Sequence, residues 1–274
     1  MIEIPESKTL GLQAGKNLAG KRIKEVTPPT SPHKYAFFCG DPGEYPNLLK
    51  GRKIQSAEGH GMFVDIHCDE NVCITIGDGT NIRLYEPSKE RPAKHQLLLE
   101  FDDGSFVAFT VAMYGGIWAY SGTLDNPYHK GSLKSISPLG DHFDEFYFDN
   151  IFNSTLKNLS VKALLATEQR IPGLGNGVLQ DILFDARIHP RRKKATFSDS
   201  EKADLFRSLK STLKRMADMG GRDTEKDLFG HFGGYPALLS KKTLDKPCSV
   251  CGDSIKKEAY LGGSVYFCPT CQPL

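Results

Sequence analysis

The sequence predicts an α+β fold in three successive parts: an N-terminal β-sandwich domain over residues 1–125, a helical domain over 146–240 and a cysteine-rich segment over 245–274. Three observations support this prediction. Short β-rich runs fill the first part, apolar residues recur with a helical period in the second, and four of the seven cysteines lie close together in the third. Residues 126–145 are rich in Asn, Pro, His and Gly, which suits a linker.

The N-terminal part contains β-rich runs separated by turn dipeptides such as Asp78-Gly79 and Asp103-Gly104. Such runs pack most naturally as an antiparallel sandwich or barrel, because each strand must bury an apolar face. The runs are GMFVDIHCD, VCITIGD, NIRLYEP, HQLLLEFDDGSFVAFTVA and GGIWAYSG.

Three helices are expected in the second part. The first covers residues 156–169, the second covers 178–186, and the third begins at Ser198 and ends at Gly220-Gly221. Glu201 stands three residues after Ser198, which is the spacing of a capping box. One apolar stripe of the third helix is expected in the core: Leu205, Leu209, Leu213 and Met216.

A glycine-rich turn, IPGLGNGVLQ from Ile171 to Gln180, separates the first two helices. Glycines at this density allow backbone N–H groups to point outward at a helix N-terminus, where an anion such as phosphate is favoured. A tight turn without any ligand explains the same residues equally well. No GK[ST] follows, so the turn is not a nucleotide P-loop.

Four cysteines near the C-terminus form two pairs, Cys248/Cys251 and Cys268/Cys271, each with a two-residue gap. This spacing lets the thiolates of each pair reach one tetrahedral ion, and the intervening segment predicts a hairpin that turns at Gly262-Gly263. Two disulfides would require a secretory context, and a redox pair would require a thioredoxin-like surround. We therefore expect a structural zinc site that does no chemistry.

The formal net charge of +2 conceals an asymmetry between the two halves of the chain. Residues 151–274 carry 20 Lys and Arg against 13 Asp and Glu, a net of +7, whereas residues 1–150 carry 15 against 20, a net of −5. A basic half is typical of proteins that bind polyanions, although a solvated basic surface has the same composition.

The cysteines outside the pairs, Cys39, Cys68 and Cys73, lie among apolar residues, as expected of buried free thiols in a reducing compartment. We find no signal peptide and no apolar run of about 18 residues. We therefore expect a cytoplasmic protein that is a monomer and is not associated with a membrane.

The glycine turn lies in the basic half and precedes the predicted zinc site. Two helices that present backbone amides and the Asn176 side chain would hold a DNA phosphate without reading the base sequence. Lys162 and the run Arg191-Arg192-Lys193-Lys194 add positive charge, although such a run is more often a solvated surface. DNA is therefore the expected partner.

This combination resembles the formamidopyrimidine-DNA glycosylase and endonuclease VIII family. The resemblance covers the whole chain: IEIPE at the start, a β domain, LLATEQRIPGLGNGVLQDILFDARIHPRR as the helix–two-turn–helix motif, and a four-cysteine zinc finger that ends in FCPTCQ. It implies DNA bound between the two domains, excision of an oxidised base that is rotated out of the duplex, and strand cleavage.

In this family the α-amine of a proline that follows the initiator methionine attacks the sugar, and the next residue, a glutamate, transfers protons. A free α-amine is a usable nucleophile near neutral pH. By the same resemblance, this sequence provides candidate residues for catalysis, DNA binding and the lesion site. They are Glu3 for proton transfer; Lys162, Gly175 and Asn176 for phosphate contacts; and Glu6 and Asp181 for the lesion site.

The sequence departs from the family pattern at the nucleophile, the wedge and the phosphate contacts. Ile2 stands where the family has proline, so the catalytic amine would be that of Met1, or of Ile2 if Met1 is removed. His60 stands at the phosphate-binding lysine, Asp78 at the methionine wedge and Gly263 at the finger arginine. VAMYGGIW also lacks the Arg and Phe that fill the gap left by the extruded base. A carboxylate at the wedge position opposes insertion between stacked bases.

Three functions remain open. The first is a damaged-DNA-binding protein with DNA glycosylase and AP lyase activity on oxidised bases or abasic sites. The second is a non-catalytic zinc-finger protein that recognises DNA structure, and the third is an enzyme that uses the cleft for a small molecule. The segment from Asp223 to Pro236 corresponds to the family's loop over the extruded base, or is a plain surface loop.

Overall fold

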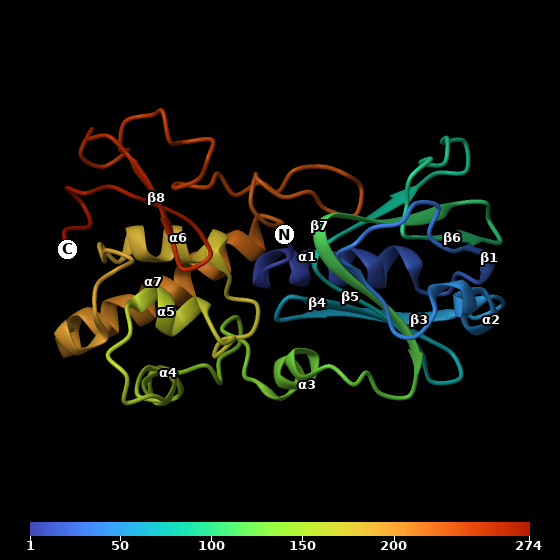
Figure 1. The fold of residues 1–274 in the computed structure, drawn as a ribbon, viewed down its shortest axis with the longest axis horizontal. Helices are drawn as coiled ribbons and strands as arrows, with labels where there is room; N and C mark the ends of the chain where they lie inside the picture. The colour runs from blue at the N-terminus through green and yellow to red at the C-terminus, as the bar shows by residue number, and fades with distance from the viewer.

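The computed structural model describes all residues from Met1 to Leu274. A β domain forms one end of the molecule, a helical part and a small finger form the other, and the N-terminus lies between them (Figure 1). The predicted order of a β domain, a helical domain and a four-cysteine segment is confirmed.

The β domain contains one seven-stranded sheet in the order β1-β6-β7-β5-β4-β3, with β2 paired to β7. All pairs are antiparallel except the short parallel pair of β2 and β7. The strands are β1 (Ile23–Thr27), β2 (Ala36–Phe37), β3 (Ile54–His60), β4 (Phe63–Cys68), β5 (Val72–Tyr85), β6 (Leu97–Phe101) and β7 (Phe106–Ser121).

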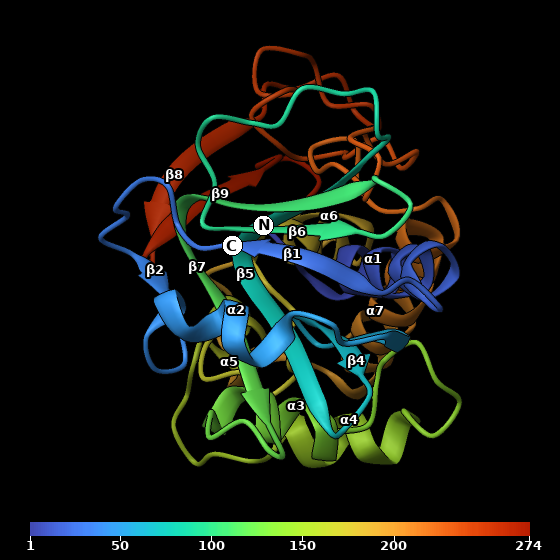
Figure 2. The same ribbon diagram turned by 90° about the vertical axis from the view of Figure 1, so that its right-hand side faces the viewer.

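Two long strands, β5 and β7, pair with each other in the middle of the sheet (Figure 2). Their pairing shifts at a bulge between Asp78 and Thr80, and a bulge bends a strand and increases its twist. Gly79 is needed at this bend, because a Cβ there would lie 2.2 Å from the carbonyl oxygen of Tyr114. One apolar core joins residues from both sides of the bulge, such as Ile74 and Phe109.

Two helices occur where the sequence predicted mainly strands: α1 (Ile4–Leu18) and α2 (Tyr45–Leu49), preceded by the 3₁₀ turn η1 (Pro42–Glu44). Helix α1 buries Leu10, Ala14 and Leu18 in the core of the sheet. These positions are four residues apart and therefore lie on one face of a helix. Tertiary packing of that face stabilises the helix by more than the two glycines inside it, Gly11 and Gly15, destabilise it.

Helix α1 crosses β3 at very close range. A Cβ at Gly59 would lie 1.8 Å from the carbonyl oxygen of Ser7, and a Cβ at Gly11 would lie 2.3 Å from the Gly59 nitrogen. The backbones of α1 and β3 can approach so closely only because neither Gly11 nor Gly59 has a side chain.

The helical part contains five helices, and one of them, α3 (Pro127–Lys134), lies in the segment whose composition suggested a linker. The first predicted helix is much shorter than expected, since α5 covers Val161–Ala166 only. The others are α4 (Glu145–Phe152), α6 (Asn176–Asp185) and α7 (Asp199–Asp218), with the 3₁₀ turn η2 (Lys194–Thr196).

The longest helix, α7, confirms the predicted start and the predicted core stripe. Ser198 is the N-cap, and its capping box with Glu201 is formed. The four stripe residues are completely buried among the residues of the helical core: Leu205, Leu209, Leu213 and Met216.

The finger contains the predicted hairpin, made of β8 (Lys256–Tyr260) and β9 (Gly263–Phe267). Its turn residues are Leu261 and Gly262, one position earlier than predicted. Both have positive φ angles, 49° and 76°, which match the right-handed twist of a two-residue hairpin.

Among the remaining cysteines, Cys68 and Cys73 are buried as expected, but Cys39 is exposed, so that part of the prediction is wrong. None of the helices combines the length and the apolar character that a membrane crossing requires.

The contact between α1 and β3 provides a stability test. Gly59→Ala is expected to destabilise the fold by at least about 3 kcal/mol, because the new methyl group overlaps the α1 backbone. Gly131→Ala is the matched control, since Gly131 lies in α3 with open space around it, and it should be neutral or stabilising by up to about 1 kcal/mol. Urea unfolding measures both variants, and equal stabilities would contradict the close contact.

Candidate functional site

The first residues of the chain lie at the junction between the β domain and the helical part (Figure 1). The amine of Met1 forms an ion pair with Glu225, and Met1 is 48% exposed. Ile2 is 5% exposed, packs in the core of the sheet and donates its N–H to the carbonyl oxygen of Asp78 at 2.8 Å. Ile2 thus fixes the start of the chain, while the amine of Met1 remains near the surface.

Glu3 places its carboxylate at the N-terminus of α6. Its Oε1 accepts a hydrogen bond from Gly177 N at 2.9 Å, and its Oε2 accepts one from Val178 N at 2.7 Å. The first amides of a helix favour an anion, and here that anion belongs to the chain itself. The sequence left two alternatives for this turn, a bound phosphate or no ligand. Neither alternative included a carboxylate from the chain itself.

The glycines of the turn make this approach possible. A Cβ at Gly175 would lie 2.6 Å from Glu3 Oε1, and a Cβ at Gly177 would lie 1.6 Å from an Nη atom of Arg222. Gly175 is therefore needed for the junction between the two parts of the molecule.

Arg222 lies between Glu3 and Glu6, and all three side chains are almost fully buried. Its Nε and one Nη donate to the two oxygens of Glu6 at 3.0 and 2.8 Å, and the other Nη lies 3.5 Å from Glu3. The backbone N–H of Arg222 also donates to Glu6 at 3.1 Å. Arg222 was not a candidate from the sequence, because its partners are more than two hundred residues away along the chain.

The Arg222 guanidinium therefore pairs with two buried carboxylates, those of Glu3 and Glu6. Burial raises the pKa of Glu3 above its ordinary value and Glu6 acts in the same direction, while Arg222 and the two α6 amides lower it. Removing Arg222 would leave both carboxylates without a cation in a water-poor environment.

Asp181, a predicted lesion-site residue, is completely buried. Its two oxygens accept hydrogen bonds from Leu238 N and Leu239 N at 2.8 and 2.9 Å. Burial raises the pKa of Asp181 to about 6, against the lowering effect of these amides. In this structure the residue ties α6 to the segment that leads into the finger, and Glu6 is similarly occupied by Arg222.

Two predicted phosphate contacts, Lys162 and Asn176, meet at the finger hairpin. Lys162 Nζ donates to the carbonyl oxygen of Tyr260, and Asn176 Nδ2 donates to that of Ser264, both at 2.5 Å. A Cβ at Gly263 would lie 3.2 Å from Asn176 Nδ2 and 3.8 Å from Lys162 Nζ. The structure therefore brings together Lys162, Asn176 and Gly263 and joins the finger to α5 and α6.

His60, the fourth predicted DNA contact, does not lie with them. Its Nε2 is 2.9 Å from Asp65 and its Nδ1 is 2.8 Å from Ser132 Oγ. Both ring nitrogens are therefore occupied within the protein. The neighbouring Gly61 touches the glycine turn, since a Cβ at Gly173 would lie 2.2 Å from the Gly61 carbonyl carbon.

The predicted wedge position, Asp78, lies at the bulge of β5 with a φ angle of 59°. Burial raises its pKa, whereas the nearby N-terminal amine and Tyr114 lower it.

The segment from Asp223 to Pro236 is anchored in the β domain, because Leu228 is completely buried and its carbonyl oxygen accepts from Leu84 N. Glu225, the partner of the Met1 amine, belongs to this segment.

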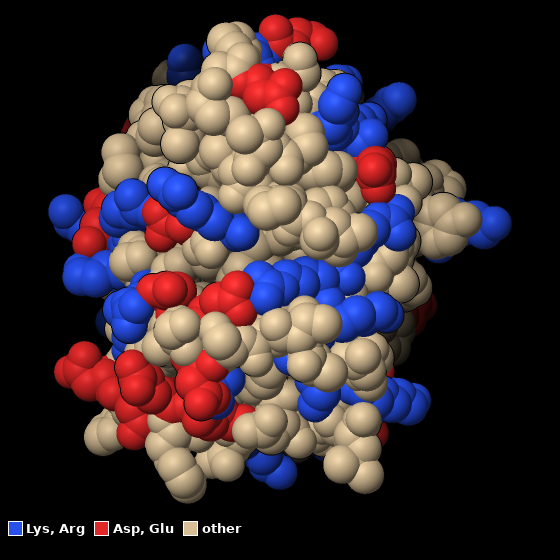
Figure 3. Space-filling view, turned by 90° about the vertical axis from the view of Figure 1, so that its left-hand side faces the viewer, with Lys and Arg blue, Asp and Glu red and all other residues tan.

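The basic run is largely engaged within the protein. Arg191 pairs with Glu258 and lies 4.1 Å from the centre of the Tyr260 ring, and Arg192 pairs with Glu201. Lys and Arg are accordingly mixed with Asp and Glu on the face drawn in Figure 3. Two residues of the run, Arg191 and Arg192, therefore belong to the protein's own ion pairs, and Lys194 donates to the carbonyl oxygens of Phe152 and Thr155.

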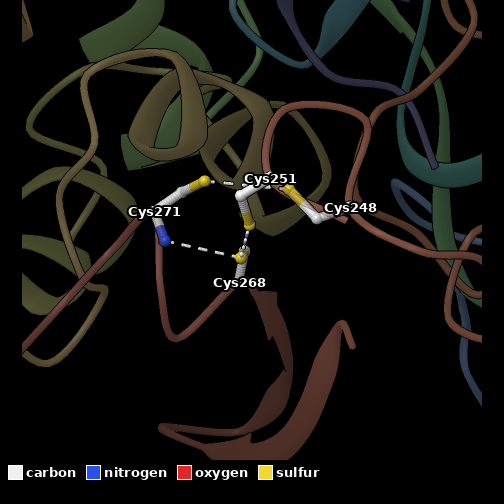
Figure 4. A group of neighbouring side chains, drawn as sticks. All are labelled: Cys248, Cys251, Cys268 and Cys271. Carbon is white, nitrogen blue, oxygen red and sulfur yellow. Dashed lines mark hydrogen bonds between the residues drawn. The ribbon is translucent and has the colours of Figure 1, made fainter. Parts of the chain in front are cut away.

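The four C-terminal cysteines converge on one point (Figure 4). The Sγ atoms of Cys248 and Cys271 are 3.8 Å apart, and those of Cys251 and Cys268 are 3.4 Å apart. Tetrahedral coordination with zinc–sulfur bonds of about 2.3 Å places sulfurs about 3.8 Å apart, so the four thiolates fit a structural zinc ion. The zinc prediction is confirmed.

Arg222 is expected to be essential for stability. Arg222→Met should destabilise the fold by about 3–5 kcal/mol, because it leaves two buried carboxylates unpaired. Adding Glu3→Gln and Glu6→Gln should restore part of that loss, since the two unpaired carboxylate charges are then gone. Urea unfolding at neutral pH measures the series, and a loss below about 1 kcal/mol for Arg222→Met would contradict the proposed role.

Removing zinc is expected to loosen α5 and α6 as well as the finger, because Lys162 and Asn176 bind hairpin carbonyls. Hydrogen exchange should accelerate in β8, β9 and the start of α6 after chelation, while α1 remains protected. Unchanged exchange at Asn176 and Gly177 would show that the contact does not depend on the metal.

Comparison with known protein families gives two matches. The formamidopyrimidine-DNA glycosylase H2TH domain matches residues 135–227, and a zinc finger found in FPG and IleRS matches residues 245–274. Formamidopyrimidine-DNA glycosylases of Cytobacillus firmus and Heliobacterium modesticaldum are 27% and 29% identical to the chain. Each alignment covers 99% of this chain and 100% of the relative.

Solved structures share the fold. Lactococcus lactis Fpg, in a complex with abasic-site DNA, matches with a TM-score of 0.83 and 22% identity over 99% of this chain and 100% of that one. MutM (Fpg) from Thermus thermophilus matches with a TM-score of 0.80 and 22% identity over 98% of both chains. The two domain matches, the full-length relatives and the shared fold together show that the chain is similar over its whole length to formamidopyrimidine-DNA glycosylases.

Proposed function

We propose that this chain binds damaged DNA and cleaves the strand at abasic sites through the amine of Met1. The observation that carries the proposal is an accessible primary amine at the junction of the two parts, beside the carboxylate of Glu225. Relatives of the chain are DNA glycosylases, and one structure of the same fold holds abasic-site DNA, which supports this class of substrate.

The chemistry requires an amine and a proton acceptor. The neutral amine adds to the C1′ aldehyde of a ring-opened abasic sugar, and water leaves as the imine forms. Loss of a C2′ proton then allows the C3′–O bond to break, and the 3′ phosphate departs with the bonding electrons. Glu225 touches the amine and is therefore positioned to take the proton that the ammonium group must lose first.

Glu3 has a supporting role in this proposal. Both of its oxygens already accept hydrogen bonds from the start of α6, so it holds the N-terminal segment beside the helical part. If Met1 were removed, the amine would be that of Ile2, whose nitrogen is bonded to Asp78. Such an amine would have to break that bond before it could react.

Abasic and unpaired sites are the favoured substrates, because the wedge position holds Asp78 and not an apolar side chain. A carboxylate would have to lose its hydration to enter a base stack, which opposes opening of an intact duplex. At an abasic site no base has to be extruded. Lys162 and Asn176 would contact the DNA backbone if a phosphate displaced the hairpin carbonyls that they now bind.

Binding to DNA structure without cleavage is the second candidate function. It is favoured by the ion pair that engages the Met1 amine with Glu225. The two candidates differ in whether a covalent bond forms.

Borohydride trapping on abasic-site DNA tests the proposal. The protein is expected to form a covalent adduct that peptide mass spectrometry locates on the N-terminal amine. A variant with two residues added before Met1 should lose the adduct, because its amine is displaced from Glu225. Intact mass confirms in each case which residue carries the amine.

Glu225→Gln tests the carboxylate separately, since it keeps the amine and removes the neighbouring carboxylate. It should slow adduct formation by about 10²-fold or more, the usual contribution of general base catalysis, while affinity for the DNA changes little. An adduct that is equally strong in the extended variant would rule out Met1. Salt-sensitive binding without any adduct would favour the second candidate.

A further inference from the structure

A second group of metal-ligating side chains lies away from the finger, where α3 packs against the sheet. His60 of β3, Asp65 of β4 and His129 of α3 place their donor atoms within 4.8 Å of one another. The Nε2 atoms of both imidazoles lie 2.9 Å from the same oxygen, Asp65 Oδ2. Histidine and carboxylate side chains that converge in this way form the usual nitrogen and oxygen ligand sets of divalent transition metals.

Two of the three side chains, those of His60 and Asp65, are held in place by neighbours. Ser132 Oγ lies 2.8 Å from Nδ1 of His60, and Thr75 Oγ1 donates to Asp65 Oδ1 at 2.6 Å. Metal-binding histidines and carboxylates typically have such partners on their remaining polar atoms, which fix the direction of the ligand. Asp65 and His129 are also almost fully buried, with exposures of 3% and 4%.

The charge of the cluster favours a cation. The Asp65 carboxylate is buried, and its ion-pair partners are two histidines and no lysine or arginine. A divalent ion would neutralise this charge, whereas neutral imidazoles only donate hydrogen bonds to it.

The distances are compatible with an ion after a small expansion. Zinc bonds of about 2.0–2.1 Å to nitrogen and oxygen place tetrahedral ligands about 3.3 Å apart, or about 0.4 Å more than the 2.9 Å separations here. The Cys251–Cys268 distance of 3.4 Å falls short of the tetrahedral value of about 3.8 Å by a similar amount. A hollow of about 990 Å³ is lined in part by Asp65 and His129.

We propose that His60, Asp65 and His129 bind a second divalent metal ion, zinc or a similar transition metal, in addition to the zinc of the finger. This ion joins β3 and β4 of the sheet to α3, which lies in the connection between the β domain and the helical part. Its role is to fix that connection. His60 is then a metal ligand and has no free nitrogen for a DNA phosphate.

The metal content of the full chain tests the proposal. After saturation with Zn²⁺ and removal of free metal, elemental analysis should find about two ions per chain, one of which belongs to the finger. His129→Gln and Asp65→Asn should each lower the content to about one. His231→Gln, at an exposed histidine outside the cluster, is the matched control and should retain about two.

Cobalt substitution of the unaltered protein gives a readout that does not depend on how the variants fold. The finger should produce thiolate-to-cobalt charge-transfer absorption, and a second equivalent of Co²⁺ should add visible ligand-field absorption without further charge transfer. Saturation at one ion, or a second ion that persists in Asp65→Asn, would overturn the proposal. The cluster would in that case be a hydrogen-bonded network that shares protons.

Discussion

The carboxylate of Glu3 at the N-terminus of α6 is the interaction on which the arrangement of the two parts depends. It comes from the third residue of a chain whose second residue is buried in the sheet, and it satisfies the first amides of a helix in the other part. A helix N-terminus and an anion attract each other most strongly where water is excluded. The glycine turn allows this contact, since a side chain at position 175 or 177 would occupy the same space.

Arg222 offsets the negative charge of the two carboxylates buried at this junction, those of Glu3 and Glu6. It binds Glu6 with two hydrogen bonds, approaches Glu3, and follows directly on the glycines that end α7. The same side chains that a catalytic interpretation would assign to proton transfer are thus occupied in holding helices together. Only the Met1 amine and Glu225 lie at the accessible side of the junction, which is why the proposed chemistry rests on them.

Features with a strong local pattern could be predicted from the sequence. Ser198 and Glu201 define the start of α7, and the two cysteine pairs define the finger, because each depends on residues a few positions apart. Helix α1 was missed because glycines and polar residues obscure the spacing of Leu10, Ala14 and Leu18. The partnerships of Arg222 with Glu6 and of Asp65 with His129 join residues that are distant in sequence, and no local pattern reveals them.

Burial of Ile2 has an evolutionary consequence. Its N–H is bonded to the carbonyl oxygen of Asp78, and its side chain fills part of the sheet core. A proline at this position would lack the donor and would not fill the same volume. Proline, the residue of the family pattern, would therefore be disfavoured by its surroundings in this chain, so replacing Ile2 by proline alone would not recover the family's chemistry, and neighbouring positions would have to change with it.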